Sequence, residues 1–190
     1  MLKNIINNYL ENLDKTIKSY NWENIRNVAE VLIQITLNKK QLLICGNGGS
    51  AGNAIHMAND FIYGISRKTG GGMRVSALSA NPAVITCLAN DEGYDRIFSE
   101  QIAVLANPGD FLLVLSGSGN SKNILMAIEE AKNKRMITAG IFGYDGGRAL
   151  EMVDYPIHFK IDDMQIAEDM QLIVGHIFMK CIAANLQNKV

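Results

Sequence analysis

The side chains of this 190-residue chain that could carry acid–base or metal chemistry occur as two spaced pairs. His56 and Asp60 lie four residues apart, and Glu168 and His176 lie eight residues apart. Within a helix, each spacing places both side chains on one side. Imidazole nitrogens and carboxylate oxygens can hold a divalent metal such as zinc, and they can equally supply the acid and the base of a proton transfer. A third interpretation, that each histidine is a structural core residue making one hydrogen bond, stays open from spacing alone.

Two glycine- and serine-rich segments each follow an apolar run and precede a helical pattern. The first is residues 46–50, Gly-Asn-Gly-Gly-Ser, and the second is residues 116–121, Ser-Gly-Ser-Gly-Asn-Ser. Glycines let backbone amides approach an anion closely, and a helix N-terminus adds a positive partial charge. The hydroxyls of the second segment could bind a phosphate without any lysine or arginine. Two such loops in one chain predict an anion site, where a single loop would be explained by a tight turn.

Other phosphate-binding motifs fit this chain less well. Gly46, Gly48 and Ala51 satisfy the dinucleotide fingerprint, which also requires an acidic residue about twenty positions later. No Asp or Glu occurs between Phe61 and Asn90. The ATP-binding loop fails as well, because no Gly-Lys-Ser/Thr follows. A small phosphorylated molecule is therefore the favoured ligand.

The elements that must position these residues alternate along the chain. Short apolar runs predict strands at 41–45, 73–78, 111–115, 136–142 and 154–159. Helical patterns fall at 51–62, 82–89, 94–105, 121–134 and 163–186, with a short turn near 148–152. This order predicts an α/β domain with a doubly wound, mostly parallel five-stranded sheet. Because ligands bind beyond the carboxyl ends of such strands, both loops are expected at one edge of the sheet.

The first forty residues predict an N-terminal helical extension ahead of the α/β core, which we place at 41–190. Apolar residues recur at helical spacing in 2–17 and again in 22–37, with no glycine in either segment. Each amphipathic helix must cover its apolar side with something. Packing on the domain itself and packing on another subunit both remain possible.

Composition limits the class of protein. Hydrophobic residues make up 48% and charged residues 19%, the net charge is -1, and the pI is near 6.3. These values favour a single globular domain and argue against a nucleic-acid partner. Three scattered cysteines suggest no disulfide framework, and neither a signal-peptide pattern nor an apolar run of about 18 residues occurs. We therefore expect a cytoplasmic protein with no membrane partner.

Five ordered motifs together resemble sugar isomerase (SIS) domain proteins of the phosphoheptose isomerase type. They are the first loop followed by residues 54–56, the pair Asn90-Asp91, the second loop, the turn at 144–147, and the segment 168–176. The resemblance covers essentially the whole chain, and it implies a single flavodoxin-like SIS domain over residues 1–190. It also implies conversion of sedoheptulose 7-phosphate to D-glycero-D-manno-heptose 7-phosphate through an enediol, in the biosynthesis of heptose for lipopolysaccharide or capsule. A homotetramer with active sites between subunits, often containing zinc, is implied as well.

The resemblance assigns roles to individual residues. It implies that the substrate is bound by Asn47, Gly48, Gly49, Ser50, Asn90, Asp91, Ser116, Gly117, Ser118, Ser121 and Glu168. One Zn²⁺ per subunit would be held by His56, Asp60, Glu168 and His176. Within the same set, Asp60 is our predicted base and His176 our predicted acid.

Two positions depart from the pattern of the family. Asp60 stands where these isomerases usually carry glutamate, which shortens the proposed base by about 1.5 Å. Glu168 stands where they usually carry glutamine, which adds a negative charge. A different ketose phosphate is therefore an open alternative. A second alternative is a non-catalytic adaptor that binds a replication initiator, although such adaptors lack the acidic residue. A third is a sugar-phosphate sensor, although such sensors usually carry a DNA-binding segment.

Overall fold

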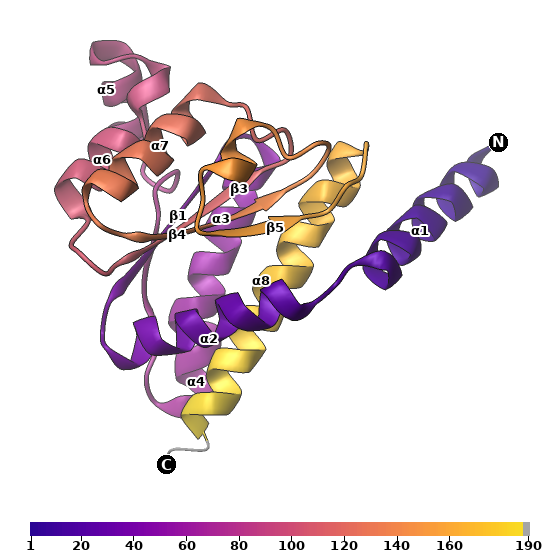
Figure 1. Ribbon diagram of the computed structural model, residues 1–190, viewed down its shortest axis with the longest axis horizontal. Coiled ribbons are helices and arrows are strands. Elements are labelled where there is room, and N and C mark those ends of the chain that lie inside the picture. Colours follow the sequence, from indigo (N-terminus) through magenta and orange to yellow (C-terminus); the bar gives the residue numbers. More distant parts are fainter. Residues whose placement is uncertain (188–190) are drawn as a thin grey trace.

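Five parallel strands form the centre of the computed structural model, which describes residues 1–187 apart from the side chain of Lys68 (Figure 1). The strands are β1 (Gln41–Gly46), β2 (Arg74–Ala77), β3 (Phe111–Ser116), β4 (Ile137–Phe142) and β5 (Tyr155–His158). Their order is β2-β1-β3-β4-β5, and every neighbouring pair is parallel. This is the flavodoxin-like order of a doubly wound sheet. The predicted fold class is confirmed, and the sheet is entirely rather than mostly parallel.

Helices cover both faces of the sheet (Figure 1). One face carries α2 (Glu23–Leu37), α3 (Gly49–Asn59), α4 (Ile65–Thr69) and α8 (Met164–Gln187), and the other carries α5 (Pro82–Asp91), α6 (Ser99–Leu105) and α7 (Lys122–Asn133). Short 3₁₀ turns occur at Tyr94–Arg96 and Arg148–Glu151. None of the helices in residues 1–187 has the length and apolarity needed to cross a membrane.

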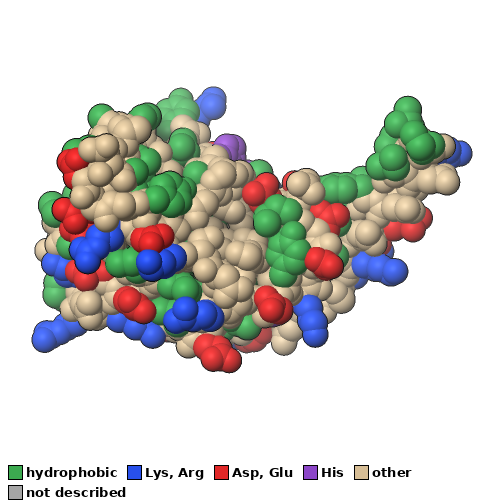
Figure 2. Space-filling model, turned by 90° about the horizontal axis from the view of Figure 1, so that it is seen from above, with side chains coloured by type: hydrophobic (Ala, Val, Ile, Leu, Met, Phe, Trp, Pro, Cys, Tyr) green, Lys and Arg blue, Asp and Glu red, His purple; other side chains and the backbone are tan. Residues whose placement is uncertain are grey.

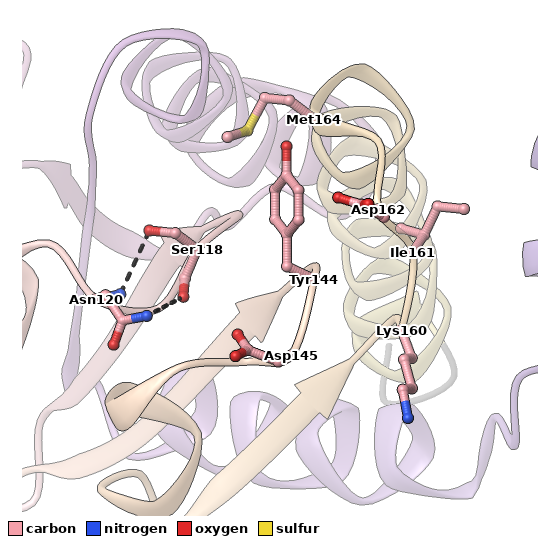
Figure 3. Close-up of a pocket in the computed structure, with 8 residues that line it drawn as sticks. All are labelled: Ser118, Asn120, Tyr144, Asp145, Lys160, Ile161, Asp162 and Met164. Atoms are coloured by element: carbon pink, nitrogen blue, oxygen red, sulfur yellow. Dashed lines mark hydrogen bonds between the residues drawn. The ribbon is translucent and has the colours of Figure 1, made fainter.

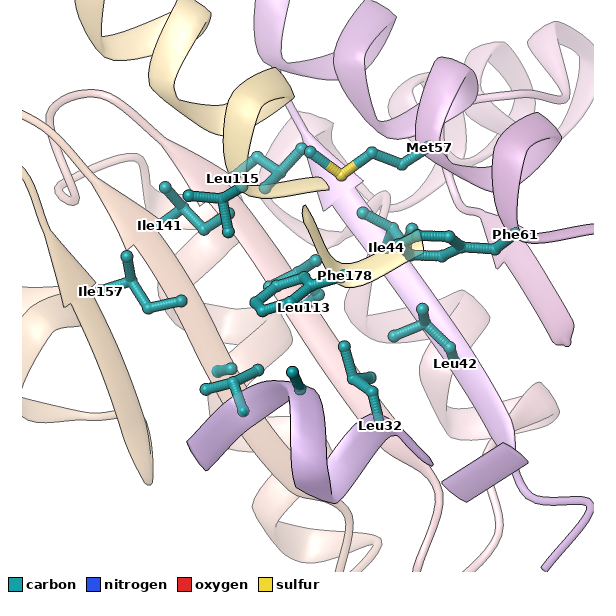
Figure 4. Close-up of a cluster of buried hydrophobic side chains, with 14 of the residues drawn as sticks. Leu32, Leu42, Ile44, Met57, Phe61, Leu113, Leu115, Ile141, Ile157 and Phe178 are labelled. Carbon is teal, nitrogen blue, oxygen red and sulfur yellow. The ribbon is translucent and has the colours of Figure 1, made fainter. Parts of the chain in front are cut away.

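The three central strands, β1, β3 and β4, are largely apolar because each of their faces contributes to a different core. Side chains alternate between the two faces of a strand. Leu42, Ile44 and Leu113 point into the cluster that includes Phe178 of α8 (Figure 4). The neighbouring strand residues, Leu43 among them, point into the second cluster, beneath α6 and α7. Burial on both faces explains why no polar alternation marks these strands in the sequence.

Helix α1 (Leu2–Ser19) extends away from this body as an arm (Figure 1). None of its residues is buried, and Leu2, Ile5 and Leu10 are more than half exposed. Hydrophobic side chains gather at the outer end of the arm (Figure 2). The inner part is attached to α8, because the Tyr9 hydroxyl donates a hydrogen bond to the Asp169 carboxylate. That bond, together with partial burial, raises the pKa of Tyr9 to about 12.

The helix that follows the first loop is longer than its sequence pattern predicts. We expected it over 51–62, whereas α3 begins at Gly49 and continues through a π-helical turn, Asp60–Gly64, into α4. A π-turn widens the helix by one residue and re-aims the side chains beside it. Asp60 is the first residue of this turn.

Candidate active site

The two glycine- and serine-rich loops meet at one pocket of about 270 Å³. It lies beyond the carboxyl ends of β1 and β3, which are neighbours in the sheet and end in register. The pocket is lined by Asn47, Gly48, Gly49, Ser50, Leu115, Ser116, Gly117, Ser118, Ser121, Met164 and Glu168. The structure therefore brings together the predicted loop residues of both segments.

The first loop is shaped by its glycines. Gly48 has a φ of 56°, a backbone conformation that residues with a Cβ rarely adopt. At Gly49 the constraint is space, because a Cβ there would overlap the Glu168 carboxylate. Helix α3 begins at this point, and the amides of Ala51 and Gly52 donate to backbone oxygens of the loop. The first two amides of the helix, those of Gly49 and Ser50, have no such partner among the described residues, and an anion in the pocket would accept their hydrogen bonds.

The second loop is held by its own hydroxyls. Ser116 is buried, and its Oγ accepts a hydrogen bond of 3.0 Å from the Gly119 amide. Ser118 Oγ accepts a longer bond, 3.4 Å, from the Asn120 amide. Ser121 occupies the N-cap position of α7 and makes no side-chain capping bond. In all three serines the hydroxyl hydrogen is still available for a ligand.

An asparagine pair joins the two loops. Asn47 Nδ2 donates to Asn123 Oδ1 at 2.9 Å, and Asn123 Nδ2 donates back to Asn47 Oδ1 at 2.8 Å. The Tyr94 hydroxyl adds a third bond to Asn47 Oδ1, at 2.9 Å. Asn123 is 2% exposed and lies behind the pocket lining, where it fixes the side chain of Asn47, which does line the pocket. We did not predict Asn123 or Tyr94, and the one available signal was a polar residue on the apolar side of α7.

The residues on either side of the turn at 144–147 hold the second loop in place through backbone hydrogen bonds. The Gly143 amide donates to Gly117 O at 2.9 Å, and the Ala149 amide donates to Gly119 O at 2.9 Å. Tyr144 stands between this loop and the start of α8, beside a second cavity of about 710 Å³ (Figure 3). That larger cavity shares Ser118 and Met164 with the loop pocket, so the two spaces adjoin.

His56, Asp60 and His176 form a compact cluster, each offering one ligand atom within 4.8 Å of the other two. The two Nε2 atoms lie 3.0 Å apart, and Asp60 Oδ2 lies 3.4 Å from His56 Nε2 and 3.5 Å from His176 Nε2. Tetrahedral zinc with bonds of 2.0–2.1 Å requires ligand atoms about 3.3–3.4 Å apart. The donor set and its spacing therefore fit a divalent metal.

The Glu168 carboxylate is not part of this cluster. It lies against Gly49 and lines the loop pocket. Eight residues of helix separate Glu168 from His176, which corresponds to a rise of about 12 Å. Both side chains do lie on the α3 side of α8, but two turns apart. The structure thus brings together three of the four predicted metal ligands and places the fourth at the anion pocket.

Asn90 and Asp91 lie apart from both groups. They end α5 with exposed side chains, and Asn90 Nδ2 donates to Asp91 Oδ1 at 2.7 Å. Asp91 Oδ2 also accepts from Cys87 Sγ, which raises the pKa of that thiol. Neither residue lines the loop pocket within this chain, so their contact with substrate stays a prediction.

The charges of the pocket are unusual for an anion site. Among the described residues that line it, Glu168 is the only charged one. A phosphate there would be held by neutral hydroxyls, backbone amides and the N-terminal ends of α3 and α7. The negative charge of Glu168 would repel the phosphate.

Comparison with known proteins agrees with this geometry. The SIS domain family profile matches residues 6–143. The phosphoheptose isomerase of Helicobacter pylori (strain P12) is 36% identical over 181 residues, covering 94% of this chain and 92% of the relative. That of Shewanella denitrificans is 36% identical over 193 residues, with coverages of 98% and 95%.

A solved structure extends the match to three dimensions. The phosphoheptose isomerase from Neisseria gonorrhoeae superimposes with a TM-score of 0.89 at 27% identity, covering 97% of this chain and 100% of that one. The chain therefore belongs to the SIS domain family and, within it, to the phosphoheptose isomerases, a group of sugar-phosphate aldose–ketose isomerases.

Proposed function

We propose that this chain interconverts sedoheptulose 7-phosphate and D-glycero-D-manno-heptose 7-phosphate. The observation that carries the proposal is the position of the acid–base cluster relative to the loop pocket. Both sites lie on the packed helices α3 and α8. Seven residues of helix separate Gly49 from His56, a rise of about 10 Å. An extended seven-carbon ketose spans about 9 Å from its carbonyl carbon to its phosphorus by ordinary bond lengths.

The proposed reaction moves one proton between neighbouring carbons through an enediol. Asp60 removes the proton from the carbon beside the carbonyl, and His176 protonates the oxygen or the adjacent carbon. Asp60 Oδ2 faces both histidines, at 3.4 Å and 3.5 Å. Because Oδ1 makes only one weak contact, 3.5 Å from Asn59 Nδ2, it is the oxygen that can accept the proton.

The proposed metal site consists of His56 Nε2, His176 Nε2 and Asp60 Oδ2, with zinc as the favoured ion. A divalent metal bound there would supply a positive charge that polarises a substrate carbonyl. Because it would occupy Nε2 of His176, His176 would donate its proton from Nδ1. The two oxygens of Asp60 can divide the tasks, since one lies at the ligand positions and the other is left for the proton. Glu168 contributes to the substrate end instead.

We propose that the chain forms the homotetramer that its resemblance to the family implies, and the exposed arm supports contact with another copy. Leu2, Ile5 and Leu10 are more than half exposed, so the outer part of the apolar side of α1 is uncovered within one chain. The inner part, with Leu13 and Ile17, packs against the core. A second copy that covers this side would also lie near the start of α8, to which Tyr9 is bonded. Subunit contacts of this kind would lie at the end of α8 that lines the loop pocket. The cytoplasmic location remains a prediction.

The alternatives make different predictions in one assay. Proton exchange and product formation from sedoheptulose 7-phosphate in deuterated water report turnover directly by NMR. We expect both with the unmodified chain and neither with Asp60→Ala or His176→Ala. A non-catalytic adaptor or a sensor would bind the sugar phosphate without exchange, and an isomerase for another ketose would exchange a different substrate in the same panel. Exchange undiminished in both variants would remove the mechanism.

A further inference from the structure

A buried chain of amides runs from α8 into the loop pocket. Gln171 is 1% exposed and lies between Asn53 of α3 and Ser50 of the first loop. Asn53 Nδ2 is 3.0 Å from both the Glu168 backbone oxygen and Gln171 Oε1. Gln171 Nε2 is 3.0 Å from Ser50 Oγ. Neither amide side chain has a role in the site described above.

The backbone oxygen of Glu168 determines which group donates in each hydrogen bond of this series of amides. The Glu168 backbone oxygen can only accept, so Asn53 must turn its NH₂ group toward it. The second hydrogen of that NH₂ group then bonds Gln171 Oε1. The amide of Gln171 is thereby oriented with its own NH₂ group toward Ser50.

The orientation of Gln171 determines where the hydroxyl hydrogen of Ser50 can point. A hydroxyl has one hydrogen to donate and two lone pairs. Because Gln171 donates to Ser50 Oγ, the hydroxyl hydrogen must point elsewhere, and Ser50 lines the pocket while being only 4% exposed. We infer that Asn53 and Gln171 are positioning residues that hold the Ser50 hydroxyl as a hydrogen-bond donor to the substrate phosphate. The inference rests on the proposed function, since it requires an anion in this pocket.

The test measures the Kd of inorganic phosphate by isothermal titration calorimetry on the full chain. Ser50→Ala should weaken binding at least about 10-fold, because a hydrogen bond to a charged group is lost. Gln171→Met, which keeps the volume but donates nothing, should weaken binding about 3- to 10-fold by freeing the hydroxyl to rotate. In the Ser50→Ala background, Gln171→Met should cause less than about 2-fold further loss, because the two residues act through one bond.

A second variant, Asn53→Asp, tests the same hydrogen bonds by reversing the orientation of the Gln171 amide. An ionised carboxylate cannot donate, so the Gln171 amide would turn its NH₂ group toward Asp and its oxygen toward Ser50. The Ser50 hydrogen would then be drawn away from the phosphate, with a loss of affinity at least as large as that of Gln171→Met. The variant leaves the buried Gln171 in place, so it carries the test if Gln171→Met does not fold.

The matched control is Gln101→Met, on the opposite face of the sheet. Gln101 Nε2 donates to Leu78 O and Ile97 O, so the same substitution removes two bonds there. Its phosphate Kd should stay within about 2-fold of the unmodified chain. With sedoheptulose 7-phosphate, Gln171→Met should raise KM and leave kcat unchanged, as expected for a lost binding contact.

Three results would overturn the inference. Gln171→Met and Ser50→Ala effects that multiply in the double variant would show that they act separately. Unchanged affinity in Gln171→Met and Asn53→Asp, with folding verified by thermal unfolding, would show no positioning role. Absence of phosphate binding by the unmodified chain would overturn the anion pocket itself, and with it the proposed function, which separates that failure from the other two.

Discussion

The loop pocket and the His56–Asp60–His176 cluster are built in opposite ways. The pocket is closed by backbone geometry and by side-chain bonds within one chain, with Ser50, Ser116 and Asn123 all buried. In the cluster, both histidine side chains are about half exposed, at 48% and 47%, and their polar contacts within the described residues are to one another and to Asp60. The difference teaches that one chain can complete the site proposed to bind the substrate phosphate, whereas the site proposed to transfer protons is left open to a metal, a substrate or a second subunit.

The largest expected effect is a loss of kcat in a variant of the cluster that leaves phosphate binding in the pocket unchanged. Asp60→Asn should lower kcat by about 10²- to 10⁴-fold, the usual contribution of a general base, because the amide cannot take a proton. Phosphate affinity should be unchanged, since the pocket is about 10 Å away. Steady-state kinetics and calorimetry measure the two quantities on one preparation. Asp14→Asn, an exposed carboxylate paired with Lys18 on α1, is the matched control and should change neither.

Metal binding sharpens the comparison next. We expect one zinc ion per chain, measured by titration with a competing chelator, and a loss of affinity of at least about 100-fold in His56→Ala and His176→Ala. Glu168→Gln should bind zinc as the unmodified chain does, because its carboxylate lies at the other end. A loss of zinc in Glu168→Gln as large as that in the histidine variants would contradict the division into two sites.

Glu168→Gln should act on the pocket instead. Removing the only charge that lines it should lower KM for the sugar phosphate several-fold at low ionic strength, because the carboxylate repels the phosphate. The gain should shrink in about 0.5 M salt, which screens charges that solvent can reach. Glu151→Gln, an exposed carboxylate on a 3₁₀ turn outside the pocket lining, serves as the control. An unchanged or raised KM would mean that the carboxylate does not face the phosphate.

The smallest expected effect concerns the attachment of the arm beside the pocket. The pKa of Tyr9 is raised from 10.0 to about 12 by its bond to Asp169. The protonated form is thus favoured in the folded state, and its contribution to stability is complete below pH 10 and lost as the pH rises toward 12. The difference in unfolding midpoint between the unmodified chain and Tyr9→Phe should therefore shrink across pH 10–12. A difference that stays constant over this range would exclude the bond as its cause.

The central strands β1, β3 and β4 were predictable because each is a largely apolar run that ends at a glycine or a serine. The predicted bounds of the strands are never more than one residue from the observed bounds. For example, β1 also includes Gly46, and β4 begins at Ile137 rather than Met136. The position of the pocket was also predictable, because loops that follow adjacent parallel strands lie at the same edge of the sheet.

Other features depend on contacts that spacing does not record. The Asn47–Asn123 pair joins residues 76 positions apart, and the π-turn at Asp60 has no sequence signature of its own. The position of Glu168 could have been anticipated, because eight residues of helix are too long for one small metal site. Residues on one side of a helix are not necessarily neighbours.

The central claim is that one substrate spans both sites, with its phosphate in the pocket and its carbonyl at the cluster. The most direct test compares kcat/KM for ketose phosphates of five, six and seven carbons, together with unphosphorylated sedoheptulose, by NMR in deuterated water. We predict the highest value for the seven-carbon phosphate, a fall of at least about 10-fold for each carbon removed, and no detectable turnover without the phosphate. Equal values along the series, or proton exchange that persists without the phosphate, would contradict the claim.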